Sequence, residues 1–230
     1  MNNIIANIKK PYIIGAVILL VVISGFFVYE HEYSPKAKYQ KGLHYYKEGN
    51  YKKAATLFKE AAKQGYAPAE EKLGYMYGRG QGVPQDYYEA VHWFKKSAKQ
   101  RYARGEFYLG IMYLARSEGS HPSKKGLYWL KKSAEQGDAE AEDILGMIYL
   151  SDSEVPQDYS KAAYWFKKAA HQDDALGEYF LSRMYQHGLG VPQDYSKAAY
   201  WIKKAEKQRY TKGEYYIDEL RKLKHLLGGY

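Results

Sequence analysis

The sequence contains no cysteine. This absence excludes a disulfide framework, a thiolate metal site, a cysteine nucleophile and a lipid-attachment cysteine. It leaves the redox compartment open, because a chain without thiols is indifferent to it.

Recognisable catalytic and ligand-binding motifs are also missing. No histidine pair forms a His-Glu-x-x-His motif, and neither a Gly-x-Ser-x-Gly elbow, a P-loop nor an acidic calcium loop is present. The glycines Gly78, Gly80 and Gly82 follow an expected helix rather than a strand, so they do not form a dinucleotide fingerprint. The sequence therefore predicts no catalytic residue, no metal ligand, no cofactor and no small-molecule substrate, and we expect a protein that is not an enzyme.

The composition is that of a folded protein with an excess of positive charge. Of 230 residues, 46% are apolar and 27% charged, which excludes collagen, wholesale disorder and a multi-span membrane protein. Lys and Arg number 35 against 26 Asp and Glu, so the formal net charge is +9. Paired lysines recur in expected helices, where we interpret them as a solvated face, and no nucleic-acid partner is expected.

One long apolar run lies near the N-terminus. Residues 11–29 carry no charge, follow Lys9 and Lys10, and would span roughly 28 Å as a helix, close to the thickness of a bilayer core. The basic flank places residues 1–10 in the cytoplasm and the rest of the chain across the membrane. We expect an uncleaved signal-anchor in the inner membrane with a periplasmic domain. The alternative is a signal peptide cleaved near Ser24, which would release the chain to the periplasm.

The rest of the chain repeats itself every 36 residues. Four columns recur at this spacing, and they are Trp93, Trp129, Trp165 and Trp201; Leu73, Leu109, Leu145 and Leu181; Tyr77, Tyr113, Tyr149 and Tyr185; and Glu70, Glu106, Glu142, Glu178 and Glu214. A fixed period of this length is the mark of stacked helical units.

Each unit is expected to contain two helices. The spacing of Ala69, Leu73 and Tyr77 places them on one helical face. Gly74 lies inside this helix, where glycine costs about 1 kcal/mol, so we expect a neighbouring helix to approach closely there. The loop Val-Pro-Gln-Asp-Tyr follows, and its aspartate is placed to cap the second helix.

The predicted fold is an all-α, α/α solenoid of about five helix-pair repeats after one transmembrane helix. Its expected segments are a cytoplasmic tail (1–10), the signal-anchor (11–29), a linker (30–38), a tetratricopeptide-like capping repeat (39–65), repeats at 66–101, 102–137, 138–173 and 174–209, and a C-terminal capping helix (210–230).

These motifs carry a family resemblance. The pattern A-E-x-x-L-G-x-x-Y, followed by G-V-P-Q-D-Y and W-F-K-K-A-A, resembles the Sel-one-like repeat, a relative of the tetratricopeptide repeat. The resemblance covers about residues 66–220. It implies a protein-binding scaffold, often exported or anchored in the bacterial envelope. Some members resemble immunity proteins that neutralise secreted toxins, including lipases delivered by type VI secretion.

A partner-binding face follows from the residues that vary between repeats. On a helical wheel, one stripe of each first helix lies opposite the core and should face the concave groove. Large apolar side chains there indicate a contact surface. We expect a partner protein to bind Tyr75, Phe107, Ile111, Leu114, Met147, Leu150, Tyr179 and Arg183. The alternative is that some of these positions pack against a neighbouring helix.

Two interpretations of the glutamate column also stay open. The column lies at the flank of the core face, where it would bind an ion or a partner, or form salt bridges with nearby lysines. The expected function is a membrane-anchored interaction scaffold of the bacterial envelope. The alternative is a periplasmic immunity or inhibitor protein that neutralises a secreted toxin such as a phospholipase.

Overall fold

The computed structural model describes residues 19, 22, 33–115, 124–151 and 156–208. In this part of the chain all regular structure is helical, without strands. Its ten helices after residue 32 are α2 (Pro35–Lys47), α3 (Tyr51–Lys63), α4 (Ala67–Arg79), α5 (Tyr87–Lys99), α6 (Ala103–Ala115), α7 (Lys124–Glu135), α8 (Ala139–Leu150), α9 (Tyr159–Ala170), α10 (Ala175–His187) and α11 (Tyr195–Lys207).

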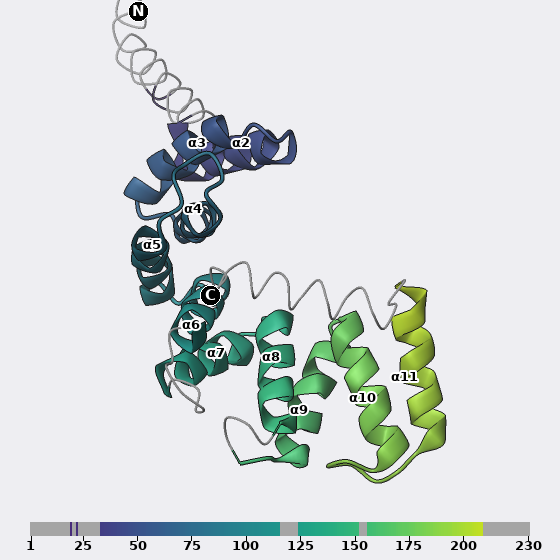
Figure 1. Ribbon diagram of the computed structural model, residues 1–230. Helices are drawn as coiled ribbons and strands as arrows, with labels where there is room; N and C mark the ends of the chain where they lie inside the picture. Colours follow the sequence, from purple (N-terminus) through teal and green to yellow (C-terminus); the bar gives the residue numbers. More distant parts are fainter. Residues whose placement is uncertain (1–18, 20–21, 23–32, 116–123, 152–155, 209–230) are drawn as a thin grey trace, which may run out of the picture.

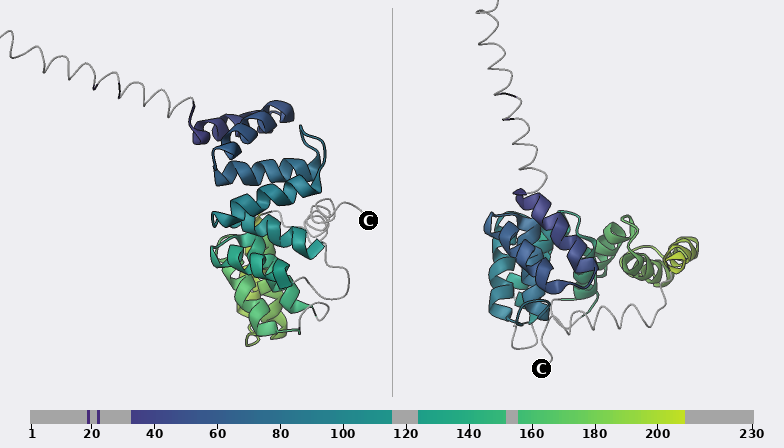
Figure 2. Two further views of the ribbon diagram at one scale, coloured as in Figure 1. Left: turned by 90° about the vertical axis from the view of Figure 1, so that its left-hand side faces the viewer. Right: turned by 90° about the horizontal axis from the view of Figure 1, so that it is seen from above.

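The helices form five antiparallel pairs, stacked in order as an α/α solenoid. We call α2, α4, α6, α8 and α10 the first helices, and α3, α5, α7, α9 and α11 the second helices. Each second helix packs against its own first helix and, from α3 to α9, against the first helix of the next pair. The stack follows an arc from α2 to α11 (Figure 1), and its layers are seen from two further sides in Figure 2.

The core lies between the two rows of helices. Four of the second helices, α3, α5, α7 and α9, each contribute one large side chain that is fully buried; these are Phe58, Phe94, Leu130 and Phe166. Facing them, the leucine column of the first helices is no more than 2% exposed. One helix pair has too little area to bury such side chains, so the stack is stabilised by contacts between pairs.

Aspartate caps begin the second helices, as the sequence predicts. The carboxylates of Asp86, Asp158 and Asp194 accept hydrogen bonds from backbone N–H groups of the first turns of α5, α9 and α11. The backbone N–H of each aspartate donates to a tyrosine carbonyl near the end of the preceding first helix, for example from Asp86 to Tyr77 O at 3.0 Å. The loop therefore fastens the two helices of a pair together.

The glutamine of the same loop ends the first helix. Gln85 Nε2 donates to Gly78 O at 2.9 Å, and Gln193 Nε2 donates to Gln186 O at 2.9 Å. The last carbonyls of a helix have no partner within the helix, so a side-chain donor stabilises them. The recurring Pro-Gln-Asp sequence is thus explained by helix capping.

The mid-helix glycines mark close contacts between helices, as expected. A Cβ on Gly74 would lie 2.8 Å from Phe94 Cε1, and one on Gly146 would lie 2.6 Å from Phe166 Cε1. The missing side chain lets the buried rings of α5 and α9 lie directly on the backbone of α4 and α8.

The first described helix begins earlier than the sequence indicates. Helix α2 starts at Pro35, with Ser34 as its N-cap, so part of the predicted linker 30–38 is helical. Proline suits the first turn of a helix, where its missing N–H is not needed.

Two predicted segments, the signal-anchor and the C-terminal capping helix, lie mostly or entirely outside the described residues. Of the predicted signal-anchor 11–29 only Leu19 and Val22 are described, and the predicted capping helix 210–230 lies outside the described residues. Among the residues that are described, no helix combines the length and the apolar character that crossing a membrane requires.

Candidate binding surfaces and the buried glutamate row

The first helices line the concave side of the arc. Helix α4 contacts α6, and α8 contacts α10, whereas in the described part of the chain no two second helices are in comparably extensive contact. Neighbouring elements lie closer together on the inner side of a curve than on the outer side. The first helices therefore lie on the inner side of the arc (Figure 1), which is the side where the sequence predicts a partner-binding groove.

Two of the predicted groove residues are not exposed. Phe107 is 4% exposed and Ile111 is 2% exposed, and both belong to the central apolar cluster together with Leu145 and Ile148. A helical wheel assumes one covered face, but α6 packs against α4, α5 and α7 at once. The expectation that Phe107 and Ile111 face the groove is wrong, and the alternative of packing against neighbouring helices holds for both.

The other predicted residues keep part of their surface. The side chains of Tyr75, Leu114, Met147, Leu150 and Tyr179 are half-buried, and Arg183 is exposed. Met147 and Leu150 pack with Phe180 on α10, and Tyr75 lies 5.6 Å from the ring of Tyr108 on α6. These contacts place Tyr75, Met147 and Leu150 at the junctions between first helices, with one side packed and the other open. Leu114 instead lies against Gly126 of α7, the second helix of its own pair.

Arginines accompany the aromatic side chains at the α4–α6 junction. The guanidinium of Arg79 lies 5.2 Å from the Tyr75 ring, and that of Arg104 lies 5.1 Å from the Tyr108 ring. Arg104 also bridges to the next first helix, with Nη1 3.1 Å from Glu140 Oε1 and 3.4 Å from Asp138 Oδ2. The role of Arg104 is not visible in the sequence, because it depends on how two neighbouring repeats are spaced.

A buried acid lies beside this junction. Glu71 is 1% exposed, and its Oε1 has no hydrogen-bond donor among the described residues. Burial raises the pKa of Glu71, and the nearby Lys72 and Arg104 lower it in part. Burial is the main cause of the raised pKa values of Tyr39, Tyr102 and Tyr108, and the nearby charge of Glu71 raises these pKa values further.

A second buried acid occupies the equivalent position two repeats later. Asp143 on α8 is 2% exposed, and its Oδ1 likewise finds no donor in the described structure. Burial raises the pKa of Asp143 well above its ordinary value, and the neighbouring carboxylate of Asp174 raises it further. Asp174 is the N-cap of α10, where its Oδ1 accepts from Leu176 N at 2.8 Å. The α8–α10 junction thus brings two carboxyl groups together.

Each described glutamate of the column links its first helix to the end of the second helix of the same pair, and we call this link a clip. The four described members, Glu70, Glu106, Glu142 and Glu178, are at most 1% exposed. Each accepts a hydrogen bond from a glutamine thirty residues later, just beyond the end of its own second helix; the donors are Gln100, Gln136, Gln172 and Gln208.

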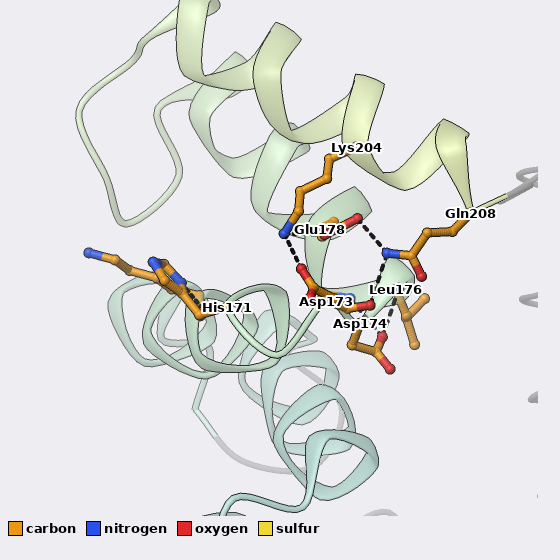
Figure 3. Close-up of polar contacts among 9 residues, drawn as sticks. His171, Asp173, Asp174, Leu176, Glu178, Lys204 and Gln208 are labelled. Carbon is orange, nitrogen blue, oxygen red and sulfur yellow. Dashed lines mark hydrogen bonds and ion pairs between the residues drawn. The ribbon is translucent and has the colours of Figure 1, made fainter.

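Lysines of the second helices complete three of these clips. Lys168 Nζ lies 2.9 Å from Glu142 Oε1, Lys204 Nζ lies 2.9 Å from Glu178 Oε1, and Lys96 Nζ lies 3.7 Å from Glu70 Oε1. Figure 3 shows the last clip, in which Lys204 and Gln208 of the α11 end reach toward Glu178 and Asp173. Burial raises the pKa values of Glu70, Glu106 and Glu142, and the lysine charges lower them in part.

The salt-bridge interpretation of the glutamate column is therefore confirmed for Glu70, Glu142 and Glu178, whereas Glu106 is held by Gln136 and Glu214 lies outside the described residues. One expectation about the lysine pairs is corrected, because only the first lysine of each pair is fully exposed. The second lysine is half-buried, and its ammonium group lies over a tryptophan ring; Lys96 Nζ, for example, is 4.6 Å from the Trp93 ring centre. The sequence did not lead us to expect that the glutamines bind these glutamates. A glutamine recurs thirty residues after each described glutamate, and this spacing could have indicated the contact.

Little in the described region suggests reaction chemistry. Among the described residues, no three or more His, Asp or Glu side chains gather in a way that could hold a metal ion. His92 is exposed and lies edge-on to Trp93 at 5.2 Å, as Tyr128, Tyr164 and Tyr200 lie edge-on to the tryptophans of the later repeats.

The Sel1 repeat model matches five consecutive stretches of the chain, at residues 29–66, 67–102, 103–138, 139–174 and 175–210. No curated protein matches the sequence. A solved Sel1 repeat protein from Oxalobacter formigenes is 30% identical, with a TM-score of 0.65, over 76% of this chain and 71% of the relative. The protective antigen c5321 of uropathogenic Escherichia coli, described as having an SLR fold, is 32% identical with a TM-score of 0.68.

These similarities differ in coverage and in sequence identity, and so in the conclusions that they support. The match to c5321 covers 78% of this chain but only 39% of c5321. The immunity protein Pa5087 of Pseudomonas aeruginosa is 16% identical with a TM-score of 0.40, over 73% of this chain and 81% of Pa5087, which is too remote to support an argument about function. The repeat model and the relative from Oxalobacter formigenes suffice for the conclusion that the chain belongs to the Sel1 repeat family.

Proposed function

We propose that this Sel1 repeat protein is a membrane-anchored interaction scaffold of the bacterial envelope that binds a partner protein along its concave face. The observation that carries the proposal is the set of half-buried apolar and aromatic side chains on the first helices: Tyr75, Leu114, Met147 and Leu150. Tyrosine beside arginine, as in Tyr75 and Arg79, is the composition of strong contact sites between proteins. The rigid helical stack places these side chains without a cost in ordering.

The anchor is the apolar segment 11–29. Its basic flank favours a cytoplasmic N-terminus, so the repeats would lie in the periplasm. Cleavage near Ser24 is the alternative, and it would give a free periplasmic protein. Membrane fractions washed with sodium carbonate would retain an anchored chain, whereas a cleaved chain would appear in the periplasmic extract with a lower mass.

A role as an immunity or inhibitor protein is the second candidate. It would use the same concave face, with a secreted toxin such as a phospholipase as the partner. The absence of catalytic motifs favours either binding role over an enzyme. Co-expression with the product of a neighbouring toxin gene would decide between them, because an immunity protein restores growth and a general scaffold does not.

Site-specific photocrosslinking tests the concave face directly. A photoreactive phenylalanine would replace Tyr75 or Met147 on first helices, and Tyr164 or Tyr200 on second helices as matched controls. The control side chains are 56% and 60% exposed. We expect one discrete adduct from the two first-helix positions and none from the controls. Equal adducts from both rows, or adducts from the controls alone, would contradict the proposal.

A further inference from the structure

The second helices α5, α7 and α9 each carry a large side chain that packs on the next first helix, fourteen residues later in the sequence. Helix α3 does not follow this pattern, because Lys72 stands fourteen residues after Phe58. The ring of Phe94 on α5 stacks on Tyr108 of α6, with centroids 5.1 Å apart and an interplanar angle of 18°. The ring of Phe166 on α9 stacks on Phe180 of α10 at 4.7 Å and 15°. Leu130 lies in the same apolar cluster as Ile144, which continues the rule with aliphatic side chains. The rule describes how one repeat docks on the previous one.

The docking surface of the last pair is uncovered in the described structure. Ile202 on α11 stands where Phe166 stands on α9, but Phe166 is fully buried and Ile202 is only half-buried. Ala163 is 4% exposed, whereas its equivalent Ala199 is exposed to solvent.

An open hollow marks this surface. Its volume is about 350 Å³, and its lining residues come from α10 and α11: Tyr179, Ser182, Arg183, Gln186, Tyr195, Ala198, Ala199 and Ile202. One repeat earlier, the equivalents Met147, Leu150, Tyr159 and Ala163 pack in a cluster with Phe180 and Leu181 of α10. The hollow is thus the seat that a further first helix would fill.

The sequence beyond Gln208 has the pattern of such a helix. Residues 213–217 read Gly-Glu-Tyr-Tyr-Ile, where 177–181 read Gly-Glu-Tyr-Phe-Leu and 105–109 read Gly-Glu-Phe-Tyr-Leu. Tyr216 stands fourteen residues after Ile202, as Phe180 does after Phe166. The glycine also fits, because a Cβ on Gly177 would lie 2.7 Å from Ala169 Cβ of the preceding second helix.

We propose that residues 211–221 of this chain dock as a sixth first helix in the hollow between α10 and α11, with Tyr216 over Ile202. The occupant supplies an aromatic ring, a small residue and an apolar side chain at the spacing that the two preceding repeats use. This inference goes beyond partner binding. It also removes Tyr179 and Arg183 from the concave contact surface, since the docked helix covers both.

A thiol-pair experiment on the full chain in detergent tests the proposal, because the natural sequence has no cysteine to interfere. The variant carrying I202C and Y216C would be treated with dibromobimane, which fluoresces once it has alkylated two neighbouring thiols. The control carries I202C and E219C, because position 219 corresponds to Arg183, which lies on the side of α10 that faces the next repeat rather than the preceding one. We expect intramolecular linkage about tenfold faster in the Y216C pair, since docking raises the local concentration of its thiol.

Other results would overturn the proposal. Equal rates in the two pairs, or no linkage in either, would show that Tyr216 is not seated over Ile202. Linkage between two chains, seen as a dimer on a denaturing gel, would assign the hollow to a second copy. A single A199C variant gives an independent measurement. Its thiol should react with a maleimide about tenfold faster when Y216S is added, and an unchanged rate would also refute docking.

Discussion

Replacing Asp143 by asparagine should make the protein more stable at neutral pH and less sensitive to pH. The Asp143 carboxyl is buried at the α8–α10 junction beside the Asp174 carboxylate, and both effects raise its pKa well above the ordinary value. The folded state therefore retains a proton that the unfolded chain has already released. The asparagine amide has the same shape, carries no charge, and can donate to Asp174 as the protonated acid does.

The sign of the effect follows from proton linkage. Stability is fully present below the unfolded pKa of Asp143 and falls as pH rises toward the folded pKa. One proton corresponds to a slope of at most about 1.4 kcal/mol per pH unit in that window. The D143N substitution removes this slope, so the gap between variant and wild type should open as pH rises from about 4 and stay constant above the folded pKa.

Urea unfolding of the two proteins between acid and neutral pH measures the gap. The substitution E135Q is the matched control, because Glu135 forms an exposed pair with Lys131 at 3.9 Å and should change stability little. A gap between D143N and wild type that does not depend on pH would refute the reasoning, as would a destabilised D143N at neutral pH.

Three further predictions concern the clips, the close contacts and the caps. The substitution E142A removes the carboxylate that Gln172 and Lys168 contact, although Lys168 keeps the Ala134 carbonyl as an acceptor. It should lower the free energy of unfolding by about 2–3 kcal/mol, less than for a fully buried pair because Lys168 is 34% exposed; urea unfolding against E135A checks it, and equal losses would contradict the proposed role of Glu142. The substitution G74A forces Phe94 off the α4 backbone and should cost about 1–3 kcal/mol in urea unfolding, against almost nothing for K167A on an exposed surface; a neutral G74A would show that the ring moves freely. The substitution Q193A removes the hydrogen bond to Gln186 O and should cost about 0.5–1.5 kcal/mol in thermal unfolding, with Q186A as the control that keeps the acceptor carbonyl; an equal effect of both would contradict the capping role.

The burial of Phe107 and Ile111 changes how the concave face is understood. A surface rich in apolar residues along every repeat would bind a partner along the whole arc. The structure instead seals the middle of α6 and leaves half-buried side chains at its ends and on α4 and α8. A partner that uses the concave face would therefore contact separate patches, around Tyr75 on one side and around Met147 and Leu150 on the other.

The sequence by itself determined the repeat, the helix pairs and the caps. These features are local or periodic: Asp86, Asp158 and Asp194 act within their own first turns, and Gly74 reports a contact inside one pair. A period of 36 residues is visible without any knowledge of how one pair sits on the next.

The tertiary structure decided which of the remaining faces are covered. Phe107 and Arg183 lie on the same stripe of the helical wheel, yet one is sealed and the other is exposed. Each inner first helix is covered by three neighbouring helices. The angle between successive pairs decides how much of its surface they cover, and a helical wheel of a single helix does not include this angle. The pairing of Asp143 with Asp174 and of Arg104 with Glu140 depends on the same angle, so it became visible only when the repeats were stacked.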